Sequence, residues 1–391
     1  MTILARATDL YAFLDAESVR NEDAGCLSDD TVARLRDGGF FSLMVPRARG
    51  GVEASPTLGI EVIEALSRAD GSPAWVVLAC NVATAAAAAY LGDAESREIF
   101  AGAPPILAGQ GAPHGEAVAD GDGFRVTGRW NYGSGILHAT QVHACARIMD
   151  GDVPRRLPSG DPEVRMFVID PRDVQLHRDW DVIGLRATAS IDYSVSGAFV
   201  QEKMTYPARS NSSAVGGDLY KLGIPGFAII GHTGFALGIG RRALDEIAKI
   251  AQSSVGIGRN LSNSDKFLQD YASAEASLLA ARSLVFDVWT KAEDMLREAG
   301  SIDVRQMTFL RLALVHATDV AAEVCTFSYR AAGGQALRRG ALERCLRDIM
   351  AAAQHIHVSP NILADCGREI SGLWANAKWG PFALIPAPRA V

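Results

Sequence analysis

The stretch YRAAGGQALRRGALERCLRDIMAAAQHIH, residues 329–357, decides the fold of this chain. It opens on a Gly-Gly pair at Gly333 and Gly334, which is typical of a turn. The residues from about Ala341 onward have the spacing of a helix. We therefore expect a turn followed by a helix that carries the chain toward its last histidines.

This helix predicts a binding face. Since a helix advances about 100° per residue, Asp348, Ala352 and His355 share one face if the helix reaches the histidine. The small side chain of Ala352 leaves that face open, so a flat ligand can lie between His355 and a polar group, Arg344, Arg347 and Asp348. The alternative is a helix packed through its alanines, with a core histidine bonded to a carbonyl oxygen.

The composition is that of a soluble globular protein, with 48% hydrophobic and 21% charged residues. The net charge of −7 argues against nucleic acid or an anionic membrane as a main partner. Six cysteines without CxxC spacing indicate free thiols in a cytoplasmic protein and no zinc site. The most apolar run, IPGFAIIGHTGFALGIG, is rich in glycine and interrupted by His232, which argues against a membrane span.

The hydrophobic pattern changes twice along the chain. Residues 1–104 have helical periodicity and include an alanine-rich segment from Trp75 onward that predicts a buried helix. Residues 105–212 contain more Gly and Pro and alternate with a period of two, which predicts a small β-barrel or sandwich. Residues 213–391 return to long helical periods with short connections, as in a four-helix bundle.

This order of domains and the quoted motif resemble the acyl-CoA dehydrogenase superfamily over essentially the whole chain. The family's C-terminal signature is a Gly-Gly turn, an Arg-Asp pair (here Arg347-Asp348) and a histidine eight residues after the arginine. Dehydrogenases usually carry a base glutamate between the turn and the pair, where this chain has Arg338, Arg339 or Gly340. The resemblance is therefore narrower, to the two-component flavin-dependent monooxygenases that share this fold.

The resemblance assigns chemistry to two residues. The strand RWNYGSG, residues 129–135, is similar to one in which a serine hydrogen-bonds the flavin near its reactive nitrogen, which here is Ser134. Trp130 and Tyr132 are expected at the flavin from the same strand. His355 is expected to act as general base on an acidic group of the substrate or to hydrogen-bond a peroxide. By itself, Ser134 is equally consistent with an ordinary turn at a strand end.

Further flavin contacts are implied by the same resemblance. The segment GLRATAS, residues 184–190, is similar to the family's GLRGTGS, with alanines at two glycine positions. We expect Ala187 and Ala189 to narrow the backbone options there, because alanine resists a positive φ. Arg259 corresponds to an arginine that reaches a flavin phosphate, although a solvated loop arginine explains it equally well. The full set expected to bind the cofactor is Trp75, Gly109, Gly111, Trp130, Tyr132, Ser134, Arg186, Thr188, Arg259, Gly333, Gly334 and Asp348.

The other histidines follow no metal-ligand spacing and are expected to be structural. Among them are His232 and His357, and the latter should point to another face of a continuing helix. Some members of the resembling family place a second histidine about two turns past the tryptophan. This chain has other residues there, namely Cys80, Asn81, Ala83 and Thr84.

The resemblance implies the oxygenase component of a two-component flavin-dependent monooxygenase. Such an enzyme uses reduced FMN or FAD and O2, through a C4a-hydroperoxyflavin, to hydroxylate an aromatic or polycyclic small molecule. The implied partners are a separate NAD(P)H:flavin reductase and further copies of the chain in a homotetramer. The alternatives are a flavin dehydrogenase acting on an acyl thioester, an N-oxygenase acting on an amine, and a non-catalytic scaffold of the same fold.

Overall fold

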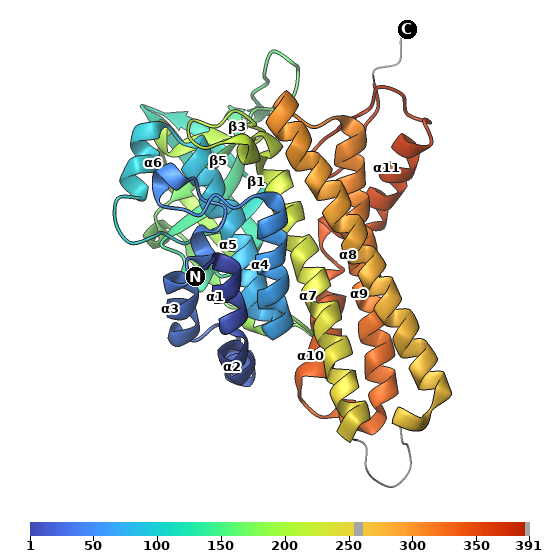
Figure 1. Ribbon diagram of the computed structural model, residues 1–391. Helices are drawn as coiled ribbons and strands as arrows, with labels where there is room; N and C mark the ends of the chain where they lie inside the picture. The colour runs from blue at the N-terminus through green and yellow to red at the C-terminus, as the bar shows by residue number, and fades with distance from the viewer. Residues whose placement is uncertain (254–260, 388–391) are drawn as a thin grey trace.

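The computed structural model describes residues 1–253 and 261–387, with helices before and after a β domain (Figure 1). Asn81 anchors the central N-terminal helix: its amide donates to the Phe40 carbonyl (2.6 Å) and accepts from the Met44 amide (3.1 Å). That helix, α5, is almost entirely buried, as its alanine-rich sequence predicts. The N-terminal helices are α1 (Ile3–Asp9), α2 (Tyr11–Ala24), α3 (Asp29–Asp37), α4 (Pro56–Ala69), α5 (Gly71–Tyr90) and α6 (Asp93–Ile99).

The β domain is one eight-stranded sheet that curls on itself. Its strands follow the order β6-β7-β2-β1-β3-β5-β8, with β4 paired to β3. The Tyr193 hydroxyl on β7 donates to the His143 carbonyl on β3 (2.7 Å), although two strands separate β7 from β3, so the sheet must bend like an open barrel. The strands are β1 (Leu107–Asp120), β2 (Gly123–Gly133), β3 (Gln141–Asp150), β4 (Val153–Pro154), β5 (Val164–Ile169), β6 (Gln175–His177), β7 (Ile191–Gln201) and β8 (Thr205–Pro207).

The C-terminal part is a helical bundle built on long helices that run side by side (Figure 1). Ser264 caps α8 by accepting from the Phe267 amide, and Asp303 caps α9 by accepting from the Gln306 amide. The elements are α7 (Gly223–Ser253), α8 (Asp265–Ala299), α9 (Val304–Ala332), α10 (Ala341–Ala352), α11 (Pro360–Ile370) and the short strands β9 (Lys378–Trp379) and β10 (Leu384–Ile385). The expected fold class is thus confirmed.

Two glycines let α7 approach the N-terminal helices closely. A Cβ on Gly234 would lie 2.5 Å from the Ile60 carbonyl oxygen, and one on Gly238 would lie 2.3 Å from the Glu64 carbonyl oxygen. Any larger residue would push α7 away from α4. This close contact fixes the position of His232, which lies on α7 next to Gly231 and is 8% exposed.

The helix in the deciding stretch is shorter than predicted. It begins at Ala341 as expected, but α10 ends at Ala352, and His355 has an extended backbone at ψ 142°. The amides of Gln354 and His355 bond back only three residues, which tightens and ends the last turn. His355 therefore does not lie on a continuing helical face with Asp348, and the prediction of an open alanine face for a flat ligand is wrong in this form.

Two apolar segments have the length and composition of a membrane-crossing helix, namely Gly71–Tyr90 and Asp218–Ser253. In each of them, 83% of the apolar window is buried inside the molecule, so both serve as core helices here. The second contains the apolar run that the sequence singled out.

Strand β1 offers a matched pair of substitutions. Gly109 has φ +145°, and a Cβ there would lie 1.8 Å from the His143 carbonyl oxygen, whereas a Cβ on Gly111 meets nothing within 4 Å. We expect Gly109→Ala to lower the free energy of unfolding by about 2–4 kcal/mol. Gly111→Ala should change it by less than about 0.5 kcal/mol. Urea unfolding of both variants measures this, and equal stabilities would contradict the strained geometry at Gly109.

Candidate active site

Trp75 is where the three parts of the structure meet. Its indole N–H donates to the Ser134 hydroxyl at the end of β2 (3.2 Å). Its ring stacks on His232 of α7, with ring centres 4.9 Å apart, and meets His355 edge-on at 5.9 Å. The same indole also contacts Phe235 at 5.0 Å. One buried aromatic side chain thus joins α5, the β domain and the bundle.

Three histidines form a cluster against this indole. The Nε2 atoms of His232 and His355 are 3.3 Å apart, and the backbone N–H of His357 donates to His355 Nδ1 at 3.4 Å. The ring centres of His355 and His357 are 5.2 Å apart, and Phe382 covers His357 from the C-terminal segment at 5.4 Å. A cavity of about 10 Å³ borders two of these histidines, and its lining residues are Trp75, His232, Phe235, Ala236, Thr318, Ile349, Ala352, His355 and Val358.

The cluster is held uncharged by its surroundings. Burial lowers the pKa of His355 to about 4. Burial, with the neighbouring imidazoles, lowers the pKa of His232 and His357 well below the ordinary value for histidine. At neutral pH the three rings are therefore neutral, each with one N–H and one lone pair.

A chain of hydroxyl groups runs from Trp75 into the β domain. Ser134 bonds Ser190 (2.7 Å), Ser190 bonds Thr188 (2.6 Å), and Thr188 donates to the Leu185 carbonyl (2.8 Å). Three non-glycine residues around this chain adopt a left-handed backbone: Tyr132 at φ +61°, Leu185 at +54° and Ala189 at +45°. Of the two alanines expected to narrow the backbone options, Ala187 has no positive φ, whereas Ala189 adopts one against the preference of alanine, and the hydrogen bonds around it hold the strained turn.

A buried polar group lies along α10, at Arg344 and Asp348. Arg344 pairs with Asp70 (3.2 Å), and Asp348 Oδ1 accepts from the Leu185 amide (2.6 Å), while its Oδ2 has no hydrogen-bond partner among the described residues. Burial raises the pKa of Asp70 to about 6. Burial, then the charge of Asp70, raises the pKa of Asp348 to about 7.

The structure brings five of the predicted residues into this network: Trp75, Ser134, Thr188, Asp348 and His355. It places others elsewhere. Trp130 lies inside the β domain, where it stacks on Tyr193 and donates to the Cys145 carbonyl. Arg186 is 47% exposed and bonds the Val182 carbonyl.

The remaining predicted residues lie at the edges of the site or away from it. Tyr132 is 62% exposed and meets Trp180 edge-on. Gly109 and Gly111 flank Gln110, whose buried Oε1 has no partner among the described residues. The turn with Gly333 and Gly334 precedes α10, so about 18 Å of helix separates it from the His355 end. Arg259 lies outside the described residues.

Sequence reasoning missed His232 and His357 as members of the site. His357 was assigned to another face of a longer helix, but the chain forms a 3₁₀ turn, Ile356–Val358, that keeps its ring beside His355. His232 follows no motif. The only signal for it was a polar residue inside the most apolar run of the chain, which calls for a buried partner.

No group of three or more His, Cys, Asp or Glu side chains in residues 1–253 and 261–387 has the arrangement of a metal site. All six cysteines are free thiols, as the sequence predicts.

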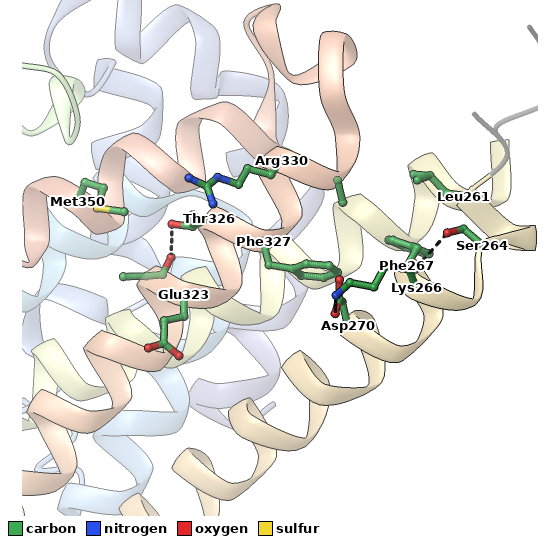
Figure 2. Close-up of a pocket in the computed structure, with 12 residues that line it drawn as sticks. Leu261, Ser264, Lys266, Phe267, Asp270, Glu323, Thr326, Phe327, Arg330 and Met350 are labelled. Carbon is green, nitrogen blue, oxygen red and sulfur yellow. Dashed lines mark hydrogen bonds and ion pairs between the residues drawn. The ribbon is translucent and has the colours of Figure 1, made fainter. Parts of the chain in front are cut away.

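A larger groove of about 760 Å³ lies on another face of α10, where Met350 contacts it (Figure 2). Its walls come mainly from the start of α8 and the end of α9, and Phe267 and Phe327 stack there at 6.1 Å. Lys266 pairs with Asp270 at its mouth, and Arg330 also lines it. None of the predicted flavin residues that the structure describes lines this groove.

Sequence comparison gives the following similarities. The acyl-CoA dehydrogenase C-terminal domain family matches residues 230–360. An indole-3-acetate monooxygenase of Pseudomonas putida is 29% identical over 350 residues, which is 88% of this chain and 87% of that protein. The oxygenase subunit HsaA of a flavin-dependent monooxygenase from Mycobacterium tuberculosis is 29% identical over 219 residues, or 55% of this chain and 53% of that protein.

Solved structures agree with the fold. The HsaA monooxygenase of M. tuberculosis superposes with a TM-score of 0.86 at 22% identity, covering 95% of this chain and 97% of that one. XiaF from Streptomyces, solved with FADH2 and glycerol, superposes with the same TM-score at 23% identity, covering 95% of each chain. These likenesses confirm the expected fold.

The raised pKa of Asp348 predicts the pH dependence of stability. Since its folded pKa lies above that of an unfolded aspartate, about 3.9, the folded state favours the protonated acid. The contribution of Asp348 to the free energy of unfolding is full below about pH 4, and it is lost as the pH rises through about 7. Asp348→Asn keeps an acceptor for the Leu185 amide but cannot ionise.

The stability difference between Asp348→Asn and wild type should therefore shift in favour of the variant as the pH rises from 4 to 7. The shift should be at most about 1.4 kcal/mol per pH unit. Free energies of unfolding in urea at pH 5 and pH 8 measure it. If the free energies of unfolding of the two proteins changed in parallel with pH, the raised pKa of Asp348 would be contradicted.

Proposed function

We propose that this chain is the oxygenase component of a two-component system. The premise is that it is a flavin-dependent monooxygenase of the acyl-CoA dehydrogenase superfamily. The observation that carries the proposal is the closed cavity between Trp75, His232 and His355. The cavity is lined by two neutral imidazoles and by the rings of Trp75 and Phe235, and the Trp75 indole bonds the Ser134 hydroxyl. No carboxylate is among the described residues that line it.

The residues around Ser134 fit a flavin. The Ser134 hydroxyl both donates and accepts, so it can bond a ring nitrogen in either protonation state. The unpaired Oε1 of Gln110 is an acceptor for a ring N–H, and the open space above Gly111 lets a flat ring approach the backbone. A flavin is far larger than a cavity of about 10 Å³, so binding requires the side chains that close the cavity to move.

Reduced FMN or FAD would supply the two electrons that activate O2, so that one oxygen atom enters the substrate and the other leaves as water. The protein's own task is to hold the substrate, exclude water and manage protons. Trp75 and Phe235 form apolar walls against which an aromatic ring can stack.

His355 is the residue best placed to take a proton from the substrate. Its low pKa, about 4, leaves it neutral and able to accept at neutral pH, but also makes it a weak base. An anionic group bound beside it would raise that pKa toward the working pH. His355 would therefore become a stronger base only when such a group is bound beside it.

The structure favours an oxygenase over an acyl thioester dehydrogenase. No acidic residue is among those lining the histidine cavity. The nearest acid to the dehydrogenase position, Glu343, pairs with Arg347 (2.6 Å) and accepts from the Gly340 amide at the start of α10. A base for an α-proton is therefore missing from the described cavity. An N-oxygenase would use the same site on an amine, but neutral histidine bases suit an acidic O–H or N–H better.

The partners follow from the proposed reaction. A separate NAD(P)H:flavin reductase would deliver reduced flavin, because this chain has no nucleotide-binding glycine motif in a strand-loop-helix context. We further propose an aromatic small-molecule substrate, a homotetrameric assembly and a cytoplasmic location shared with the reductase.

The test is an assay with reduced FMN or FAD from a flavin reductase, O2 and an aromatic probe such as indole-3-acetate, comparing wild type with two His355 variants. Wild type should form oxygenated product. His355→Ala should lower product formation by roughly 10²–10⁴-fold, the usual contribution of a positioned acid-base group. The flavin should still be oxidised, so hydrogen peroxide should rise as product falls.

His355→Asn keeps a hydrogen bond but cannot take up a proton near neutral pH, so it should be as uncoupled as His355→Ala. A variant that melts at lower temperature yet forms product normally would show that His355 is a core residue. Absence of product in wild type, together with rapid flavin reduction by an acyl thioester without O2, would support the dehydrogenase instead.

Ser134→Ala tests flavin contact, with Ser190→Ala as a matched control. Each variant removes one buried hydroxyl from the same chain and should cost about 1–3 kcal/mol of stability. Only Ser134→Ala should weaken the anaerobic binding of reduced flavin, by about 1 kcal/mol, or roughly fivefold in Kd. Equal Kd values for the two variants would remove Ser134 from the flavin site.

A further inference from the structure

We propose that His232 is a positioning residue for His355: its Nε2 accepts the Nε2–H of His355, which leaves the Nδ1 lone pair of His355 to take up a proton. The inference rests on the proposed function for its chemistry, but not for its geometry. The atoms that carry it are the two Nε2 atoms, 3.3 Å apart, and the His357 backbone N–H, 3.4 Å from His355 Nδ1.

The tautomer of His355 follows from its two neighbours. A backbone N–H can only donate, so His355 Nδ1 must carry the lone pair toward His357. The single proton of neutral His355 then lies on Nε2 and points at His232 Nε2, which must be the acceptor. The proton of His232 consequently lies on its Nδ1, which has no hydrogen-bond partner among the described residues.

His232 occupies the place that a carboxylate holds behind many catalytic histidines. It is held there by the stacked indole of Trp75, with an interplanar angle of 21°, and by the close packing of Gly231 against Leu78. The other groups that face the pair are uncharged: Thr318 from α9, and Ile349 and Ala352 from α10. A neutral acceptor orients His355 without placing a negative charge in the cavity.

The proton balance of the pair is simple. The acidic proton of the substrate moves to His355 Nδ1, which gives up its long hydrogen bond from the His357 backbone N–H (3.4 Å) in this step. His355 becomes a cation with N–H at both nitrogens, His232 stays neutral and keeps accepting the His355 Nε2–H, and the substrate keeps the negative charge. Only N–H bonds and the acidic bond of the substrate change, so no oxidant or reductant enters this step.

Two variants of His232 separate positioning from packing. The Oε1 of Gln can accept the His355 Nε2–H, whereas Leu is of similar size and cannot accept. We expect His232→Leu to lower product per reduced flavin by roughly 10–100-fold, the usual cost of removing the partner that orients a functional histidine. Hydrogen peroxide should rise in parallel, while His232→Gln should stay close to wild type in both measurements.

His177→Gln is the matched control. It makes the same substitution at a histidine of the β domain that bonds Ser194 and lies outside the cluster. We therefore expect unchanged coupling between flavin oxidation and product. A similar loss of product in His232→Leu and His232→Gln, with His177→Gln unchanged, would overturn the positioning role.

A second measurement needs no activity and no flavin. In wild type labelled with ¹⁵N-histidine, the His355 ring, assigned with His355→Asn, should show a proton on Nε2 and a lone pair on Nδ1. His232→Gln should keep this tautomer, and His232→Leu should give a mixture. A proton on Nδ1 of His355 in wild type would overturn the inference even if the enzyme oxygenates its substrate. The predicted tautomer in a protein that forms no product would instead contradict only the proposed function.

Discussion

The hydrogen bond from the Trp75 indole to the Ser134 hydroxyl is the contact on which the site depends. It is the point where α5, which belongs to the helical core, touches the end of β2. The two partners of this hydrogen bond then support different parts of the site. The indole face supports His232 and His355, while the hydroxyl begins the chain through Ser190 and Thr188. A shift of α5 would therefore disturb the histidines and the strained turn together, although they are far apart in the sequence.

The strained turn is stable because side chains bond both backbone groups of Leu185, its amide and its carbonyl. Leu185 has a left-handed backbone, yet its amide donates to Asp348 and its carbonyl accepts from Thr188. Left-handed non-glycine residues cost about 1 kcal/mol or more each. The strained turn in return supports Ser134 through Thr188 and Ser190. Asp348 holds the turn from α10 by accepting from the Leu185 amide, and it does not line the histidine cavity. The role of the Arg-Asp motif in this chain is thus to brace the turn through Leu185.

Much of the fold was predictable because it follows from local periodicity, as in the buried α5 and the start of α10 at Ala341. Residues of the candidate site could be singled out only where a motif marked them, as for Ser134 and His355, and their roles stay predictions. The end of α10 was not predictable, because three-residue backbone bonds and an extended His355 replace one further helical turn without any Gly or Pro to signal it. His232 could not be found either, since its role depends on how closely two glycines let α7 pack on α4.

Among the residues that the structure describes, no carboxylate lines the histidine cavity. Asp70 and Arg344 lie toward the start of α10, and Asp348, one turn before its end, bonds the Leu185 amide and does not line the cavity. In the proposed oxygenase, a permanent charge beside the cavity would hold water there, and water is what an oxygen-activating site must exclude. Neutral imidazoles would avoid this, because they would gain charge only when a proton arrives from the substrate. A second histidine in place of a carboxylate would therefore let the site remain dry at rest and still accept a proton during turnover.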